Sequence, residues 1–350
     1  MREFSRTERK RGGVAPPVES EGSHREIRLT TIQITRATDV LPPEEIAALQ
    51  PTIDEIERLK VERNAIVAAH NYMTPDIYHL AADIAGDSLA LANLALETEA
   101  EVIVLAGVHF MAETAKIINP AKTVLIPDLR AGCSLADGIT GEDLRRLKQR
   151  FPDVPVVSYV NTSAEVKAES DITCTSSNAV AVVESLGVDR VIFTPDQYLG
   201  KWVASQTDVE VILWEGSCMV HERFTGEEIA SYRNDDRDIK VIAHPECPPD
   251  VLAEADYVGS THGMINWVKG NRPERVMMIT ECSMADNVAG ATPETTFVRP
   301  CVLCPHMKRI TLDGIRRSLE TMTYRVEIPE NVAKRAREAI FRMLEVGRQD

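Results

Sequence analysis

The sequence predicts an α/β protein made of three homologous three-layer α/β/α domains, each with a parallel sheet, arranged with approximate three-fold symmetry. Short apolar runs typical of strands alternate with helical segments along the 350 residues, and this alternation favours parallel sheets with helices on both faces. In addition, four features recur in a constant order at intervals of 85 to 89 residues. Such a repeat indicates copies of one structural unit.

The first recurring feature is a threonine followed by acidic and apolar residues. It occurs at Thr52, Thr140, Thr225 and Thr311, at successive intervals of 88, 85 and 86 residues. Threonine can cap the first turn of a helix, and an acidic residue three positions later can complete a capping box. We therefore expect a helix to begin at each of these threonines.

The second and third features are an apolar strand that ends in polar residues and an acidic turn that opens a helix. The three strands run into His70-Asn71-Tyr72, Tyr159-Val160-Asn161 and His244-Pro245-Glu246. The three turns span residues 83–88, 171–176 and 256–261, and they end in Ser88, Ser176 and Thr261. Because the offset between the two features is 17 or 18 residues in every copy, these residues should occupy equivalent positions in the three domains.

The fourth feature is a strand, a helix and a strand that are closed by a cysteine. Cys133, Cys218 and Cys304 close the three copies at intervals of 85 and 86 residues, whereas Cys301 fits this spacing less well. The repeat predicts domains at residues 45–139, 140–224 and 225–310, with residues 311–350 packed onto the first domain and residues 1–44 forming a mobile tail.

Composition narrows the class of protein. The chain has 54 acidic and 39 basic residues, and its formal charge of −15 argues against general nucleic-acid binding. We find neither an apolar run long enough to span a membrane nor a secretory signal, so we expect a cytoplasmic protein. The seven cysteines are odd in number and widely spaced, which is not typical of a disulfide framework. We interpret Cys174, Cys247, Cys282 and Cys301, which fall off the repeat or lack partners, as packing or lining residues.

Ligands of parallel α/β sheets bind beyond the carboxyl ends of the strands. If the three domains face a common axis, the three repeated cysteines meet there, and three thiolates suit an iron–sulfur cluster. Three ligands leave one iron open, where it can act as a Lewis acid. The alternative is a zinc site with three cysteines, and the close spacing of Cys301 and Cys304 is typical of zinc ligands. A structural zinc site, however, normally has four protein ligands.

The other repeated residues suit an anionic substrate and proton transfer. Ser88, Ser176 and Thr261, here called the anion cradle, are expected at helix N-termini, where free N–H groups attract anions. The strand-end set follows the strands and comprises His70, Tyr72, Tyr159, Asn161, His244 and Glu246. Its histidines and glutamate can move protons, and its Asn161 offers an oriented amide. His221 follows Cys218 by three residues and could reach the same centre.

Six segments of this sequence resemble the quinolinate synthase family. The resemblance covers about residues 45–325 and is carried by residues 69–72, 131–137, 159–164, 175–179, 244–247 and 304–308. It implies three homologous α/β domains around one [4Fe-4S] cluster. It also implies a transferase that condenses iminoaspartate with dihydroxyacetone phosphate to quinolinate, phosphate and water in de novo NAD (pyridine nucleotide) biosynthesis. A functional link to L-aspartate oxidase or aspartate dehydrogenase follows from that reaction.

The resemblance carries over residue by residue. It implies that Cys133, Cys218 and Cys304 are the cluster ligands. It also implies that the anion cradle and the strand-end set apart from Tyr72 are the acid–base and substrate-binding residues, whereas Tyr72 is a catalytic candidate from its place at a strand end. One departure is the Trp214–Ser217 segment, which lacks a proline common in the family. Two alternatives stay open: another triple-domain iron–sulfur enzyme with radical or reductive chemistry, and a non-catalytic protein whose three cysteines bind a metal.

Overall fold

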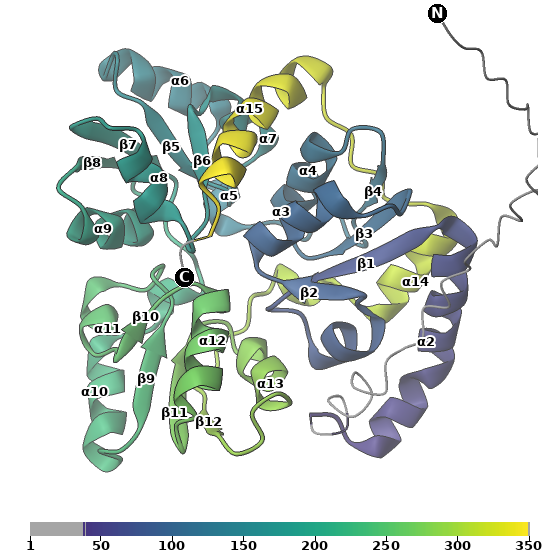
Figure 1. The fold of residues 1–350 in the computed structure, drawn as a ribbon. Coiled ribbons are helices and arrows are strands. Elements are labelled where there is room, and N and C mark those ends of the chain that lie inside the picture. Colours follow the sequence, from purple (N-terminus) through teal and green to yellow (C-terminus); the bar gives the residue numbers. More distant parts are fainter. Residues whose placement is uncertain (1–37, 39, 349–350) are drawn as a thin grey trace, which may run out of the picture.

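Three four-stranded parallel sheets form the framework of the molecule (Figure 1). The computed structural model describes residue 38 and residues 40–348. The strand orders are β2-β1-β3-β4, β6-β5-β7-β8 and β10-β9-β11-β12, so the same topology occurs three times. Every pairing is parallel. The predicted fold class is therefore confirmed.

The elements follow one another with the same rhythm in each unit. The first unit contains α2 (Pro43–Arg63), β1 (Ala65–His70), the π-helix η1 (Ile77–Ala81), β2 (Ile84–Gly86), α3 (Ser88–Glu97), β3 (Val102–Ala106), α4 (His109–Ile118), β4 (Thr123–Leu125) and α5 (Ser134–Asp137). The second contains α6 (Gly141–Arg150), β5 (Val156–Tyr159), α7 (Ala164–Glu169), β6 (Ile172–Cys174), α8 (Ala179–Ser185), β7 (Arg190–Thr194), α9 (Gln197–Gln206), β8 (Glu210–Leu213) and η2 (His221–Arg223).

The third unit and the C-terminal helices complete the chain. The third unit contains α10 (Gly226–Asp235), β9 (Lys240–Ala243), α11 (Pro249–Ala253), β10 (Tyr257–Val258), α12 (Thr261–Asn271), β11 (Arg275–Ile279), α13 (Ser283–Ala289), β12 (Thr296–Val298) and η3 (Met307–Arg309). It is followed by α14 (Leu312–Thr321) and α15 (Glu330–Val346). Each sheet lies within one of the predicted segments 45–139, 140–224 and 225–310, whose limits stay predictions.

Short edge strands lie within segments 83–88, 171–176 and 256–261, which the sequence predicts to be turns. β2, β6 and β10 contain only two or three residues, and an aspartate precedes each of them. Asp83, Asp171 and Asp256 accept a hydrogen bond from a backbone N–H at or near the start of the neighbouring central strand, at 2.7, 2.8 and 2.8 Å. The repeated aspartate is thus a structural residue that fastens the edge strand to the centre of the sheet.

Three of the four threonines begin a helix as expected. Thr140, Thr225 and Thr311 are the N-caps of α6, α10 and α14, and Thr140 forms a complete capping box with Asp143. Thr52 is different, because it lies inside α2, which already begins at Pro43. Proline is favoured in the first turn of a helix, where its missing N–H costs nothing.

The C-terminal helices pack against different units. α14 lies against α2 and β3 of the first unit. α15 instead packs mainly against α7 and β6 of the second unit and also contacts α4, so it bridges two units (Figure 1). The predicted tail 1–44 lies almost entirely outside the described residues. Within the described part of the chain, no helix combines the length and apolarity needed to cross a membrane.

Candidate functional site

A central hollow of about 730 Å³ lies where the three units meet. Loops that follow the strands of all three sheets line it, as expected for parallel sheets. The structure brings together every residue singled out from the repeat: His70, Tyr72, Ser88, Cys133, Tyr159, Asn161, Ser176, Cys218, His244, Glu246, Thr261 and Cys304 all line this hollow. Residues up to 234 positions apart in sequence thus share one site.

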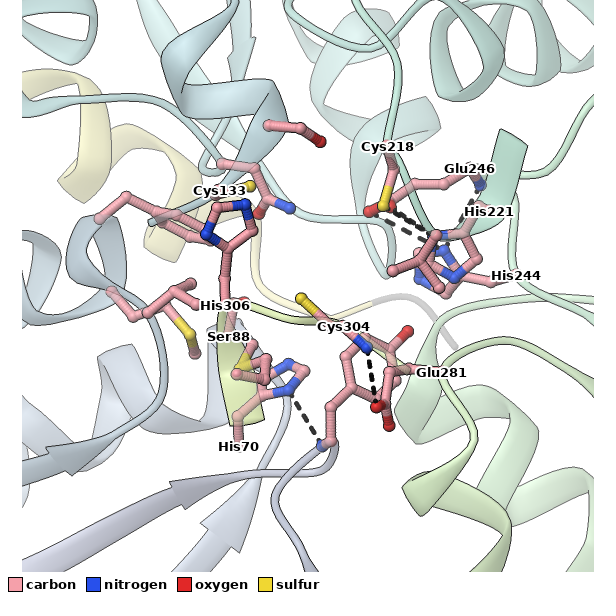
Figure 2. Close-up of a pocket in the computed structure, with 18 of the residues that line it drawn as sticks. His70, Ser88, Cys133, Cys218, His221, His244, Glu246, Glu281, Cys304 and His306 are labelled. Atoms are coloured by element: carbon pink, nitrogen blue, oxygen red, sulfur yellow. Dashed lines mark hydrogen bonds and ion pairs between the residues drawn. The ribbon is translucent and has the colours of Figure 1, made fainter. Parts of the chain in front are cut away.

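The three repeated thiols surround the same hollow (Figure 2). Cys133 precedes α5, Cys218 precedes η2 and Cys304 precedes η3, so each thiol lies just before a short helical turn. Burial raises the pKa of all three thiols, and that of Cys133 reaches about 12. They stay protonated without a cation, and a metal group would bind by displacing these protons.

The spacing of the thiols does not suit a single metal ion. In tetrahedral zinc sites the Zn–S distance is about 2.3 Å, which places the sulfurs roughly 3.8 Å apart. Within the described part of the chain, one group of three possible metal ligands has all its ligand atoms within 4.8 Å of one another, and it is Cys218, His221 and Glu246. Because Cys133, Cys218 and Cys304 do not form such a compact group, their donor set fits a larger, thiolate-bound metal group.

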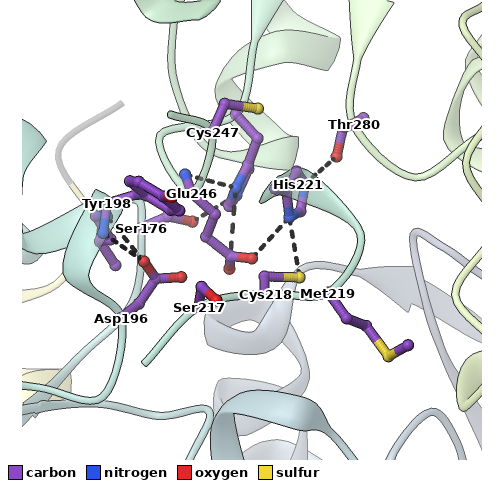
Figure 3. A network of polar contacts seen from close by, with 12 residues as sticks. Ser176, Asp196, Tyr198, Ser217, Cys218, Met219, His221, Glu246, Cys247 and Thr280 are labelled. Carbon is purple, nitrogen blue, oxygen red and sulfur yellow. Dashed lines mark hydrogen bonds and ion pairs between the residues drawn. The ribbon is translucent and has the colours of Figure 1, made fainter. Parts of the chain in front are cut away.

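A chain of hydrogen bonds runs through Glu246, and Figure 3 shows its contacts with His221 and Thr280. Tyr159 donates to Oε1 of Glu246 at 2.6 Å, and Nδ1 of His221 lies 2.8 Å from Oε2. Nε2 of His221 contacts the Thr280 hydroxyl at 2.9 Å, which in turn contacts the Tyr72 hydroxyl at 2.6 Å. Tyr72 of the first unit and Tyr159 of the second unit are therefore linked through His221 of η2 and through Glu246 and Thr280 of the third unit.

Glu246 is the charged centre of this chain. Burial raises the pKa of its carboxyl, but contacts with His221, His244 and Tyr159 outweigh burial and hold the pKa below its ordinary value. Burial raises the pKa of Tyr159 well above its usual range, so its hydroxyl remains a hydrogen-bond donor. The site thus contains an ionised carboxylate that accepts two hydrogen bonds.

His70 and His244 are equivalent in orientation as well as in sequence position. Nδ1 of His70 accepts a hydrogen bond from the backbone N–H of Tyr72 at 3.2 Å, and Nδ1 of His244 accepts one from Glu246 at 3.4 Å. Burial lowers the pKa of His70 to about 4 and that of His244 to about 3, so both rings are neutral near pH 7. The proton of each ring is therefore on Nε2, which in His244 lies 3.2 Å from the Ser176 hydroxyl.

The anion cradle is formed by two helix starts and one preceding turn. Ser88 and Thr261 are the first residues of α3 and α12, whose N-caps are Asp87 and Ser260. The expectation is wrong for Ser176, which lies two residues before Asn178, the N-cap of α8. The Thr175–Asn178 turn is held by hydrogen bonds to the Asn178 side chain, which delays the start of the helix.

Several lining residues were not singled out from the sequence, among them Asp87, Glu281 and His306. Glu281 holds the loop that carries Cys304, because its Oε1 accepts a hydrogen bond from the backbone N–H of Cys304 at 3.2 Å and lies 3.0 Å from the Lys308 ammonium. Glu281 is the second residue after the end of β11, so its place after a strand was the signal from which it could have been predicted. Gly216 has no room for a side chain, since a Cβ there would lie 2.3 Å from the Pro195 carbonyl oxygen.

The remaining cysteines lie outside the hollow. Cys174 and Cys247 are fully buried, in line with a packing role. Cys282 and Cys301 are joined by a disulfide, which corrects their interpretation as unpaired packing or lining residues. Their sequence separation of 19 does not by itself suggest pairing, but β11, α13 and β12 fold the chain back so that the two Cα atoms lie 4.9 Å apart.

Comparison with known proteins agrees with this geometry. A family model described as "Quinolinate synthetase A protein" matches residues 54–345. The chain belongs to the quinolinate synthetase A family. One relative in this family, quinolinate synthase 2 of Mesorhizobium japonicum, is 62% identical over 311 residues, which cover 89% of this chain and 96% of the relative.

Other members of the quinolinate synthetase A family give the same picture. The quinolinate synthase of Agrobacterium fabrum is 57% identical and is covered over 90% of its length by 89% of this chain. The quinolinate synthase of Xylella fastidiosa is 55% identical and is covered over 87% of its length by 84% of this chain. The matched regions include all three sheets and the central hollow.

Proposed function

We propose that this chain forms quinolinate by condensing iminoaspartate with dihydroxyacetone phosphate, with release of phosphate and water. The observation that carries the proposal is the convergence of three equivalent cysteines, two equivalent histidines and the anion cradle on one hollow. Family membership, with relatives named quinolinate synthase at 55 to 62% identity, supports it. The place of the reaction in NAD biosynthesis follows from its product.

We assign Cys133, Cys218 and Cys304 as ligands of one [4Fe-4S] cluster. The three-thiol donor set and its spacing support a cluster over a single zinc ion. When bound, the cluster supplies a Lewis acid for the final dehydration, through the iron that lacks a protein ligand. No net oxidation or reduction is needed for the condensation, which separates this proposal from radical or reductive chemistry.

The chain's own residues bind the substrates and move protons. The helix starts at Ser88 and Thr261, with Ser176, would hold carboxylate and phosphate oxygens. His70 and His244 would donate from Nε2 to substrate oxygens, because their Nδ1 atoms already accept backbone N–H groups. The Glu246 carboxylate and the Tyr159 and Tyr72 hydroxyls would relay protons along their hydrogen-bonded chain during isomerisation and ring closure.

Iminoaspartate must come from the oxidation of aspartate, so an L-aspartate oxidase or an aspartate dehydrogenase is the expected functional partner. The test supplies iminoaspartate, generated in situ from aspartate by such an enzyme, and dihydroxyacetone phosphate to the anaerobically reconstituted protein. Quinolinate is then measured by mass spectrometry. Formation that requires both substrates would support the proposal. No quinolinate from a protein with a full complement of iron and sulfide would overturn it.

A further inference from the structure

Arg348 forms a bidentate ion pair with an acidic residue of the central hollow. Its two terminal nitrogens donate to the two carboxylate oxygens of Asp87 at 2.8 and 2.7 Å. Asp87 lines the hollow, is 7% exposed and directly precedes Ser88 of the anion cradle. A residue near the C-terminus thus contacts the substrate-binding region of the first unit.

A second contact fixes the segment that carries Arg348. The side-chain amide of Asn178 donates to the backbone oxygen of Gly347 at 2.9 Å, and Asn178 is the N-cap of α8. Residues 347–348 therefore connect the start of α3 in the first unit with the start of α8 in the second. Figure 1 shows the end of α15 directed toward the middle of the molecule, where the units meet.

The charges of the hollow explain why this ion pair matters. Asp87, Glu246 and Glu281 line the hollow, and among its described lining residues none is lysine or arginine. A free carboxylate next to Ser88 would repel a carboxylate or phosphate, because Coulomb interactions of a few ångströms are strong in a buried site. Burial raises the pKa of Asp87, but the hydrogen bonds and charge of Arg348 outweigh burial and keep this carboxyl ionised.

We propose that Arg348 is a positioning residue that acts through Asp87: it neutralises this carboxylate and so allows the start of α3 to bind an anionic group of the substrate. The inference rests on the proposed function, because the anions concerned are those of its substrates. The Asp87 carboxylate also caps α3, because it accepts a hydrogen bond from the backbone N–H of Ala90 at 2.9 Å. Arg348 thus permits a charged cap beside an anion site.

The test compares three variants with the unaltered protein. Arg348→Met removes the cation, Asp87→Asn removes the carboxylate but keeps a capping oxygen, and the double variant removes both. Arg342→Met is the matched control, because Arg342 lies on α15, the helix that precedes Arg348, and donates to the Asp171 backbone oxygen outside the hollow. The affinity of the apoprotein for succinate is measured by calorimetry, and KM and kcat are measured on the reconstituted enzyme.

We expect Arg348→Met to weaken succinate binding roughly tenfold and to raise KM by a similar factor, with kcat changed less than about twofold. The double variant should bind succinate about as well as the unaltered protein and the control, and Asp87→Asn, which leaves the Arg348 cation without its carboxylate, should bind it at least as well. Unchanged affinity in Arg348→Met would overturn the inference. Affinity in the double variant as low as in Arg348→Met would also overturn it, because Arg348 would then act on the ligand directly.

Failure of this inference is separate from failure of the proposed function. Quinolinate formation by the unaltered protein tests the function alone, whereas the comparison among variants tests Arg348. Equal succinate affinities in a protein that forms quinolinate would leave the function standing and remove the role of Arg348.

Discussion

Two residues of the hollow make the same hydrogen bond in the first and third units. His70 and His244 each accept the backbone N–H two residues ahead at Nδ1, which leaves Nε2 as the protonated nitrogen. The repeat in sequence predicts that the two histidines are equivalent. It does not predict their tautomer, because that depends on which backbone N–H the folded loop places near each ring.

Replacement of a single repeated cysteine should abolish the cluster. We expect Cys133→Ala, Cys218→Ala and Cys304→Ala each to lose the visible absorption of the reconstituted cluster and the activity, because each thiol supplies a ligand that no neighbour replaces. Cys174→Ala is the matched control, since Cys174 is fully buried and outside the hollow. A Cys304→Ala protein with full absorption would contradict the assignment.

The neutral histidines should make the apoprotein less stable in acid. The pKa of His70 is about 4 when folded and about 6.5 when unfolded, so between these values the unfolded chain binds a proton that the folded chain does not. Above pH 6.5 the neutral ring of His70 therefore makes its full contribution to the free energy of unfolding. This contribution, roughly 3 kcal/mol, is lost as the pH falls from 6.5 toward 4. Denaturant unfolding between pH 4 and 7 should show a shallower slope in His70→Asn. Equal slopes would contradict burial of a neutral ring.

At the scale of helices and strands, a local sequence pattern predicts a helix start correctly where its own residues satisfy the free backbone groups of the first turn. The capping box of α6 forms as predicted because Thr140 and Asp143 satisfy each other's backbone groups. Thr52 has the same local pattern but lies inside α2, since the prolines before it already start the helix. The edge strands β2, β6 and β10 were missed because two or three residues give no periodic pattern.

The start of α3 should contribute directly to anion binding. Ser88→Ala removes a hydroxyl at the first position of this helix, and loss of one hydrogen bond to a charged group costs about 1.5–3 kcal/mol. Succinate affinity of the apoprotein should fall by about tenfold or more. Thr225→Ala is the control, because it removes the N-cap of α10 outside the hollow and should lower stability by about 1 kcal/mol without changing affinity. Equal affinities of the two variants would argue against the cradle.

At the scale of the whole molecule, the sequence repeat predicts the architecture because each unit obeys the same local rules. Cysteines 85 and 86 residues apart meet because the three sheets share one topology and face one hollow. Features outside the repeat could not be predicted in this way. The position of α15 against the second unit and the Cys282–Cys301 disulfide arise from tertiary packing that no periodic pattern records.

The central claim is that three equivalent cysteines hold one iron–sulfur cluster rather than a single ion. The measurement that tests it most directly is the content of iron, acid-labile sulfide and zinc in the unaltered protein after anaerobic reconstitution. We expect about four irons and four sulfides per chain, as a [4Fe-4S] cluster requires, and no stoichiometric zinc. One zinc per chain with no sulfide would contradict it.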